Sequence, residues 1–285
     1  MSRSPKLDVI IINYNSDKSA TKLIKSLKII DSIIEKIFII DNNSKHFHLP
    51  KNKKIKIFKN QQNLGFAKAV NIGIKNSNSD FILLLNPDSY LLDDSIKLIF
   101  NQIINDKKIG IIGGKIIGNN NQQQPTANLS PSFLTGLFEF TNLKKIFPNN
   151  AFSKKFWPET NQIIKKPIEV DSLCGAFMLI RKKQNHKLAL FNEKYFLYLE
   201  DLDFGLATLK RKFKIVFNPN AKIFHKGGGS NSSIYKIVLK EWYKSRKIFF
   251  KEHLKLFPGT ILYIIFSIEE CLLKIFHKIK NEPNY

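Results

Sequence analysis

Two aspartates follow apolar runs of the sequence directly, Asp41 in IFIIDNNS and Asp88 in FILLLNPDS. The five apolar residues Phe81 to Leu85 fit a strand buried on both faces, and Pro87 ends such a strand because it has no N–H to donate. Ligands of open α/β sheets bind outside the carboxyl ends of the strands. Either aspartate alone could merely cap a turn. Since Asn13-Tyr14-Asn15 also follows a strand, we expect all three segments to face one ligand-binding crevice.

A second group of reactive side chains lies in the last third of the chain. The segment YLEDLDF holds Glu200, Asp201 and Asp203. Acidic residues suit the first turn of a helix, which explains one of the three but not all. In IFHKGGGS, His225 ends a short apolar strand, and the three glycines after it leave the backbone open to a ligand. A lone histidine is usually structural, and the glycines favour a site.

The first 117 residues alternate between strands and helices. Such alternation predicts an α/β fold with a mostly parallel, Rossmann-like central sheet flanked by helices. The expected strands are 9–13, 36–41, 54–58, 81–85 and 109–117, and the expected helices are about ten residues after the cap Ser16, 65–77, and 93 or 94 to 105.

The pattern changes twice further along the chain. Residues 118–166 are irregular and contain polar runs, prolines and scattered aromatics, which is typical of a surface loop or a short helical excursion. Strands are expected again at 168–173, 176–181, 214–217 and 221–224, with a helix from Glu200. We therefore predict one α/β domain at 1–233, which contains the irregular segment 118–166, and a basic amphipathic helical tail at 234–285.

Composition limits the setting of the protein. The 285 residues contain 46 Lys and Arg against 23 Asp and Glu, a net charge of +23 that suits nucleic acid, an anionic membrane or a phosphorylated substrate, or is simply a lysine-rich surface. Cys174 and Cys271 are far apart, which favours a reducing compartment. The N-terminus lacks the features of a signal peptide. We expect no spanning helix, because Pro258-Gly259 breaks the apolar run 257–268 and Glu269-Glu270 ends it.

Seven segments, in this order and spacing, resemble family 2 glycosyltransferases over about residues 7–230. Among these enzymes the chain is most similar to the rhamnosyltransferases of bacterial polysaccharide and O-antigen assembly. The segments are NYNS (13–16), DNNS (41–44), NLGFAKAVNIGI (63–74), LLLNPDS (83–89), CGAFMLIR (174–181), YFLYLEDLDF (195–204) and HKGGGS (225–230).

The resemblance implies a GT-A fold, inversion at the anomeric carbon, a nucleotide-sugar donor and a divalent metal, Mg²⁺ or Mn²⁺. A hard cation held by oxygen ligands can neutralise the charge that develops on a nucleoside diphosphate leaving group. Asp88 would hold this metal, in a motif where Asn86 takes the first position of the family's Asp-x-Asp. His225 would complete the site, and its imidazole suits Mn²⁺ better than Mg²⁺.

The same resemblance assigns the remaining site residues. Glu200 and Asp201 match the acidic motif that deprotonates the acceptor hydroxyl, with Asp201 favoured as the base and Glu200 as its support over the reverse. The donor-binding residues would contact the base and ribose or shape the loop and helix beside the donor; they are Tyr14, Asn15, Asp41, Asn63, Gly65, Asn71 and Asn86.

Two departures leave the donor open. The chain has Ala189-Leu190-Phe191-Asn192 where the family commonly has Gly-Gly-Phe-Asp, and Ala207-Thr208 where an arginine is frequent. We expect dTDP-rhamnose, with a UDP-hexose as the alternative. The acceptor would be a glycan or a polyprenyl-linked sugar. The resemblance makes 1–233 the GT-A catalytic domain, with 118–166 as an acceptor-side insertion.

Three other readings compete. A basic nucleic-acid-binding protein would explain KSRKIFFKEHLKLF but would leave the strand-end carboxylates without purpose, so we expect no nucleic acid partner. A nucleotidyltransferase usually has a glycine-rich loop after the first strand, where this chain has NYNSDKS. A catalytically inactive relative remains open, although the carboxylates are present.

The tail interleaves basic and aromatic residues, which suits an interfacial helix on an anionic membrane. We expect a cytoplasmic protein, peripheral on the inner face of the cytoplasmic membrane. The alternative is that these aromatics pack on the catalytic domain or in a homodimer.

Overall fold

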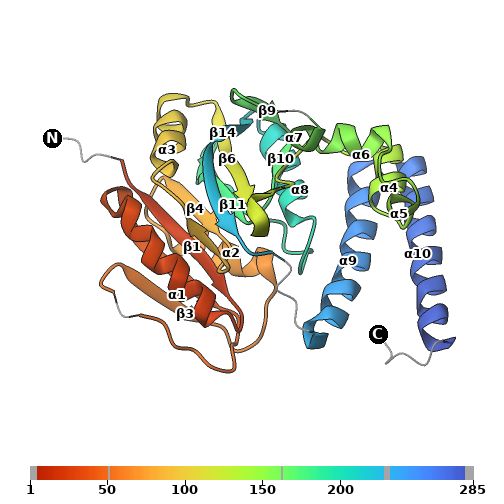
Figure 1. Cartoon of the computed structure of the whole chain (residues 1–285), viewed down its shortest axis with the longest axis horizontal. Coiled ribbons are helices and arrows are strands. Elements are labelled where there is room, and N and C mark those ends of the chain that lie inside the picture. The colour runs from red at the N-terminus through yellow and green to blue at the C-terminus, as the bar shows by residue number, and fades with distance from the viewer. Residues whose placement is uncertain (1–4, 51, 162, 228–231, 280–285) are drawn as a thin grey trace.

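A computed structural model describes residues 5–50, 52–161, 163–227 and 232–279 of the chain. A central sheet is covered by helices, and a hairpin of two long helices lies beside this α/β body (Figure 1). Within the described residues, ten strands join the central sheet, with the main order β3-β2-β1-β4-β11-β6-β14-β5.

The first half of the sheet is parallel, as predicted. It consists of β1 (Leu7–Asn13), β2 (Ile34–Asp41), β3 (Ile55–Lys59) and β4 (Phe81–Leu85). β1 and β4 are buried along their whole length, because both faces of these apolar strands are covered by helices. β1 and β2 end side by side at Asn13 and Asp41, so their polar ends share one edge.

Helices α1 (Asp17–Ser26), α2 (Phe66–Asn76) and α3 (Ile96–Asn105) connect and cover these strands. A 3₁₀ segment, η1 (Leu27–Ile33), leads from α1 into β2. Two predicted helix starts need correction. The Ser16 hydroxyl donates to Tyr14 O and does not cap α1. α3 begins after Asp93 and Asp94, because the Asp93 side chain accepts a hydrogen bond from Ser95 N–H in a turn before the helix.

The second half of the sheet is mixed. β11 (Phe177–Arg181) runs antiparallel between β4 and β6 (Ile109–Ile117), and β14 (Lys214–His225) is parallel to β6. β14 is one strand with a register shift between Asn218 and Lys222, where two strands were predicted. Short strand β5 (Ser89–Leu91), which was not predicted, pairs with its end. The expected strand at 168–173 is two strands, β9 (Ile168–Val170) and β10 (Ser172–Leu173).

Residues 118–166 form short elements and no separate domain. They are η2 (Asn119–Asn121), β7 (Gln123–Gln124), β8 (Ala127–Asn128), α4 (Phe133–Glu139), α5 (Leu143–Ile146), α6 (Ala151–Phe156) and α7 (Pro158–Asn161). β12 (Lys183–Gln184) and β13 (Lys187–Leu188) make a small hairpin before α8 (Glu200–Lys210). The prediction of a short helical excursion at 118–166 is thus met by α4 to α7, of which α4 packs on α10 and α7 contacts β8 (Figure 1).

The tail is a helical hairpin of α9 (Ser232–His253) and α10 (Leu256–Ile279). Its inner face shares an aromatic cluster with the preceding segment: Phe140, Phe156, Phe249, Phe250 and Phe266 are all buried. Several of the tail aromatics therefore pack on the rest of the chain, which was the alternative to membrane contact. The final predicted residues of the tail, 280–285, lie outside the described part.

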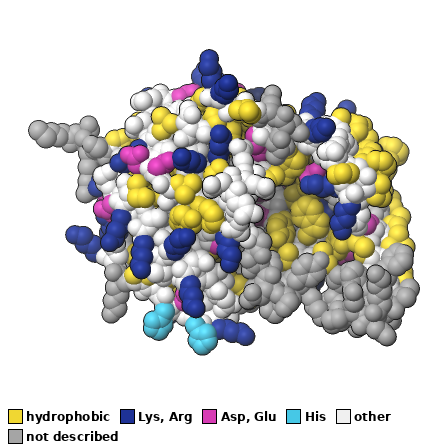
Figure 2. Space-filling model, viewed as in Figure 1, with side chains coloured by type: hydrophobic (Ala, Val, Ile, Leu, Met, Phe, Trp, Pro, Cys, Tyr) yellow, Lys and Arg dark blue, Asp and Glu magenta, His cyan; other side chains and the backbone are white. Residues whose placement is uncertain are grey.

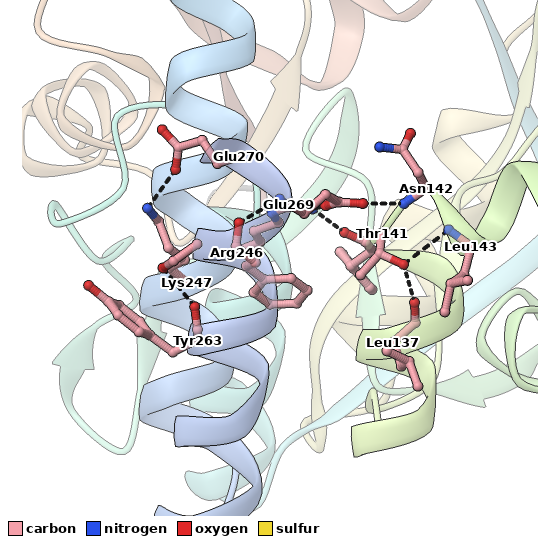
Figure 3. Close-up of polar contacts among 12 residues, drawn as sticks. Leu137, Thr141, Asn142, Leu143, Arg246, Lys247, Tyr263, Glu269 and Glu270 are labelled. Carbon is pink, nitrogen blue, oxygen red and sulfur yellow. Dashed lines mark hydrogen bonds and ion pairs between the residues drawn. The ribbon is translucent and has the colours of Figure 1, made fainter. Parts of the chain in front are cut away.

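A buried ion pair holds this hairpin together and fastens it to the end of α4 (Figure 3). Arg246 is 1% exposed, and its Nη1 donates to Glu269 Oε2 at 2.6 Å and to Phe140 O at 2.5 Å. Glu269 Oε1 accepts from Asn142 N–H at 2.6 Å. Lys247 pairs with Glu270 at 2.7 Å beside it. The tail is consequently packed against the segment that follows β8 and is not a free appendage.

The outer face of α10 is apolar and exposed. Leu256, Phe257, Ile264, Ile268 and Leu272 are each at least half exposed. Among the described helices, the stretch Leu256–Ile275 is long and apolar enough to cross a membrane by length and composition. The expectation that Pro258-Gly259 would break this run was wrong, because Pro258 lies in the first turn of α10, where proline is tolerated.

Candidate active site

A cavity of about 640 Å³ lies at the carboxyl ends of β1 and β4. Its wall combines polar residues that follow these strands with residues of the 196–198 turn and of α9. In Figure 2 a hollow separates the α/β body from the helical hairpin, with hydrophobic side chains on its floor, and Lys and Arg are scattered over this face. Predicted site residues in the wall are Tyr14, Asn15, Asn63, Gly65, Asn86 and Asp88.

Asp88 lines this cavity and contacts His225, which is not among the residues of the cavity wall. β5 pairs with the end of β14 in a register that aligns Ser89 with His225, so the turn after β4 faces the histidine. His225 Nε2 lies 3.2 Å from Asp88 Oδ1 and 3.4 Å from Asn86 Nδ2. The pairing of two strands distant in sequence therefore gathers these three side chains.

Gln124, on β7, completes the group and was not predicted. Its Oε1 is 3.0 Å from His225 Nδ1, and its Nε2 donates to His225 O at 3.1 Å. The amide oxygen at Nδ1 holds the ring in the orientation in which Nε2 faces Asp88. Gln124 lies in the polar run NNNQQQ, where nothing in the sequence separates it from a loop residue.

The electrostatics of Asp88 favour its charged form. Burial opposes ionisation, but the hydrogen bond and charge of His225, together with backbone hydrogen bonds, hold the pKa of Asp88 below its ordinary value. One carboxylate oxygen and one imidazole nitrogen form a donor set that fits a divalent cation with oxygen and nitrogen preferences, such as Mn²⁺. The predicted glycines 228 and 229 after His225 lie outside the described residues.

Polar residues after β1 and β2 form a linked network at the other end of the cavity. Asn13 Nδ2 donates to Asp41 Oδ1 at 2.9 Å, and the Ser44 hydroxyl donates to the same oxygen at 2.6 Å. Ser44 Oγ also accepts from the N–H of Asn15, whose φ of 52° places it in the left-handed region. Asp41 is 3% exposed and lies behind the wall, where it fixes the turn that presents Tyr14 and Asn15.

The loop before α2 has a backbone conformation that suits glycine. Gly65 has φ of +80°, and a Cβ there would lie 2.5 Å from Phe196 O. Asn63 Oδ1 accepts from Gly65 N–H at 2.9 Å, and Phe66 N–H donates to Phe196 O at 2.7 Å. Asn63 and Gly65 thus shape the cavity wall and join it to the segment before the acidic motif.

Asn71 lies on α2 away from the cavity. It is 1% exposed, donates to Phe191 O at 2.9 Å and accepts from Phe191 N–H at 2.8 Å. It also donates to Glu193 Oε1 at 3.0 Å. Asn71 therefore fixes the segment leading to the acidic motif and does not line the wall.

The acidic motif begins α8 after a strained turn. Tyr198 and Leu199 have φ of 70° and 65°, which is rare for residues of their size. Asp201 is half buried and accepts hydrogen bonds from Gly175 N–H at 3.1 Å and Leu202 N–H at 2.9 Å. Glu200 is 6% exposed, and its Oε2 has no hydrogen-bond partner among the described residues.

Glu200 and Asp201 both have a raised pKa, so each holds a proton more readily than an ordinary carboxyl group. Burial, followed by the neighbouring charge of Asp201, raises the pKa of Glu200 well above its ordinary value. Burial also raises the pKa of Asp201, against the two backbone hydrogen bonds that its carboxylate accepts. A carboxylate with a raised pKa is a better proton acceptor at neutral pH.

The loop 174–176 connects the two halves of the site. Gly175 N–H donates to Asp201, and Ala176 O accepts from Asn86 N–H at 3.2 Å. The charges of Asp201 and Asp88 both contribute to raising the pKa of Cys174, to about 12, although burial is the largest cause. The two predicted acidic centres therefore flank one short loop, although Glu200 and Asp201 are not part of the cavity wall.

Three further wall residues were missed by the sequence analysis. Lys226 follows His225 and brings a cation to the cavity, while its N–H donates to Asp88 O at 3.1 Å. Ile237 and Val238, from α9, supply an apolar part of the wall. Their place next to the site could not be inferred, because the tail was treated as a separate segment.

Comparison with known proteins agrees with this geometry. The family model described as glycosyl transferase family 2 matches residues 8–188. An N-acetylglucosaminyl-diphospho-decaprenol L-rhamnosyltransferase of Mycobacterium tuberculosis is 23% identical over 258 residues, 85% of this chain and 83% of the relative. A low-salt glycan biosynthesis hexosyltransferase of Haloferax volcanii is 25% identical over 216 residues, 73% of this chain and 63% of the relative.

Solved structures share the fold. GalNAc-T7 with UDP, GalNAc and Mn²⁺ aligns with a TM-score of 0.59 and 14% identity, covering 100% of this chain and 59% of that chain. S. aureus TarS 1-349 in complex with UDP aligns with a TM-score of 0.53 and 18% identity, covering 92% and 70%. The fold is GT-A, and the chain belongs to glycosyl transferase family 2.

Proposed function

We propose that this glycosyltransferase moves rhamnose, with inversion, from dTDP-rhamnose to a lipid-linked sugar in cell-surface polysaccharide synthesis. The observation that carries the reaction type is the contact between Asp88 and His225 at a cavity in a family 2 fold. The rhamnosyl specificity is supported by the name of the mycobacterial relative, which is 23% identical. A UDP-hexose donor is the alternative, favoured by the UDP bound in the TarS structure.

The donor would occupy the main cavity. Tyr14 and Asn15 would contact the nucleoside, on a turn that Asp41 holds from behind. Asn86 and Lys226 would contact the diphosphate, since both line the cavity beside Asp88. Asp88 and His225 would hold a divalent metal, Mn²⁺ in preference to Mg²⁺ because of the imidazole. When bound, such a cation stabilises the negative charge of the leaving diphosphate.

Asp201 would act as the general base. Its carboxylate would take the proton of the acceptor hydroxyl while the hydroxyl oxygen bonds to the anomeric carbon and the bond from that carbon to the diphosphate breaks. Gly175 and Leu202 orient the carboxylate through their N–H groups. Burial and the charge of Asp201 favour the protonated form of Glu200, which would leave the negative charge of the pair on Asp201. A single displacement inverts the anomeric configuration.

We further propose that the enzyme works on the cytoplasmic face of a membrane with α10 lying in the interface. The exposed apolar residues of α10 and the exposed Lys244, Lys251 and Lys255 of the hairpin support this placement. α10 would lie in the interface and not span the bilayer, because Glu269 and Glu270 are tied to Arg246 and Lys247 of α9.

Product analysis with a panel of nucleotide sugars tests this function. The enzyme, Mn²⁺ and a lipid-linked N-acetylglucosaminyl diphosphate should give a disaccharide product and free dTDP from dTDP-rhamnose, with the anomeric configuration inverted by NMR. Turnover only with a UDP-hexose would replace the rhamnosyl assignment with the alternative. Retention of configuration would exclude the single displacement.

A further inference from the structure

A second cavity, of about 360 Å³, lies between α9 and α10. Its apolar wall consists of Ile237, Leu239, Tyr243 and Leu273, and we call it the hairpin groove. Ile237 lines both this groove and the main cavity, so the two spaces meet at one side chain. Ile237 is 47% exposed.

The groove also has basic residues. Lys240 and Lys274 line it, and Lys240 is exposed to solvent. Glu270 lies in the same wall, but its carboxylate pairs with Lys247 at 2.7 Å and with Lys274 at 2.7 Å, so its charge is balanced. An apolar groove with a lysine at its side suits a ligand in which an anionic group is joined to a hydrocarbon chain.

The groove residues of α10 are neighbours in sequence of residues on its exposed apolar face. Leu272 and Ile275 flank the groove residues Leu273 and Lys274 in sequence and are 50% and 49% exposed. A chain that leaves the groove would therefore pass directly onto the surface proposed to contact the bilayer.

We propose that the hairpin groove binds the first isoprenoid units of the polyprenyl diphosphate acceptor, with Lys240 contacting the diphosphate. This inference rests on the proposed function, because it requires a lipid-linked acceptor in the main cavity. The sugar would lie in the main cavity, the diphosphate near Ile237, and the hydrocarbon chain between the two helices. The hairpin would thus select the acceptor as well as contact the membrane.

Acceptor chain length provides the test. Full-length enzyme in detergent is assayed with the same N-acetylglucosaminyl diphosphate carried on a decaprenyl chain or on a short octyl chain. Wild type should prefer the decaprenyl acceptor through a lower KM. Leu239→Glu, which places a charge in the groove, should raise KM for the decaprenyl acceptor about tenfold, the effect of losing contact with about two methylene groups. Its kinetics with the octyl acceptor should stay within about twofold.

Two controls keep the result specific to the groove. Ile268→Glu alters the same helix at a residue that is 55% exposed and does not line the groove, so it should match wild type in detergent. Lys240→Gln should raise KM for both diphosphate acceptors, whereas Lys240→Arg, which keeps the positive charge, should have a KM near that of wild type. If Lys240 had only a structural role, keeping the charge would not restore KM. Lys240 is exposed, so its replacement leaves the core intact.

The possible outcomes separate this inference from the proposed function. Equal use of both acceptors by wild type, or an equal loss on both acceptors in Leu239→Glu, would overturn the groove while leaving the transfer reaction in place. Equal KM values would also be the result if the groove held bulk lipid instead of the acceptor's own chain. Transfer to neither acceptor would overturn the proposed function, and the groove assignment with it.

Discussion

His225 Nε2 lies 3.2 Å from Asp88 Oδ1, although the two residues are far apart in the sequence. The strand pair β14 and β5 creates this proximity, and Gln124 orients the imidazole by contact with Nδ1. The arrangement brings an imidazole nitrogen next to a carboxylate oxygen of Asp88, which lines the cavity. These two atoms are the ligands of the proposed metal site, which the first two predictions test.

Replacing Asp88 by alanine should abolish transfer and weaken donor binding in the presence of Mn²⁺, while donor binding without metal stays near its wild-type value. The reason is that the carboxylate acts on the donor through the cation. Calorimetric titration of dTDP with and without Mn²⁺ measures this difference. Asp94→Ala is the matched control, because Asp94 is an exposed residue that pairs only with Lys97 among the described contacts. Full metal-dependent turnover in Asp88→Ala would exclude the site.

Gln124→Ala should lower the affinity for Mn²⁺ by about 10–100-fold, the usual effect of losing a partner that orients a ligating histidine. The Asp88 carboxylate is untouched in this variant, so any loss comes from the imidazole. Mn²⁺ binding can be followed by electron paramagnetic resonance of the free ion. Gln124→Glu, which keeps an acceptor at Nδ1, should retain most of the affinity. Unchanged binding in the alanine variant would mean that His225 does not ligate the metal.

Glu200→Gln should stabilise the protein at neutral pH. The pKa of Glu200 is raised in the folded state by burial and by the charge of Asp201, so the folded protein keeps a proton that the unfolded chain loses at lower pH. Wild-type stability therefore falls as the pH rises from the ordinary carboxyl pKa through the raised one. Glutamine carries no charge to bury. The stability of Glu200→Gln relative to wild type should therefore increase as the pH rises across this window and stay constant above it.

The melting temperature between about pH 4 and about pH 8 measures this effect. A gain of about 1 kcal/mol would raise Tm by roughly 2–4 °C in a domain of this size. Glu169→Gln is the control, because Glu169 is 63% exposed and pairs with Lys214 at the surface. A pH-independent difference between wild type and Glu200→Gln would show that folding does not raise the pKa of Glu200.

Arg246→Met should destabilise the hairpin by about 3–5 kcal/mol, since it leaves Glu269 with a buried charge and no cation. Arg246→Met combined with Glu269→Gln should recover much of this loss, because glutamine is neutral and can still accept from Asn142 N–H. Urea denaturation of both single variants and the double variant gives the coupling energy. Lys274→Met, at an exposed pair, should cost less than about 1 kcal/mol. Additive losses in the double variant would contradict the buried pair.

The strands of the first half of the sheet could be predicted from the sequence because their limits are local. The run Phe81 to Leu85 is apolar throughout and is ended by Asn86 and Pro87, and the structure places β4 at these same residues. β5 has only three residues and no pattern of its own, and it forms because β14 lies beside it. The antiparallel position of β11 between β4 and β6 also depends on partners that no local pattern reveals.

Some residues of the candidate site could also be located from local patterns, whereas the place of others depends on distant partners. Asp88, Asn86 and Tyr14 could be located because each follows a buried strand at one edge of the sheet. Asp41 follows a strand too, yet it lies behind the wall, because Asn13 and Ser44 take up its carboxylate. The role of Gln124 could not be predicted, since its contact with His225 depends on the pairing of β7 with β6.

The tail shows where composition leaves two outcomes open. Interleaved aromatics and lysines look the same in sequence whether they face protein or lipid. In the structure Phe249 and Phe250 are buried and the ring of Phe250 contacts Phe140, whereas Phe257 and Ile264 are 77% and 51% exposed. The helix therefore has both kinds of face. Deleting the tail would uncover the aromatic cluster, so membrane binding is better tested with substitutions on the outer face.

The full-length protein should bind anionic vesicles through this outer face. Phe257→Glu, Ile264→Glu and Ile268→Glu together place three charges where each apolar side chain would contribute about 1.5–3 kcal/mol by burial. The triple variant should stay at the bottom of a flotation gradient with phosphatidylglycerol vesicles at low salt, while wild type floats. Raising the salt should weaken wild-type binding, because each lysine near the surface contributes about 1 kcal/mol.

Ile57→Glu, at a 46% exposed residue of the edge strand β3, is the matched control and should float like wild type. Donor binding should be the same in all three proteins. If wild type does not float at low salt, or if the triple variant floats equally well, α10 does not contact the membrane.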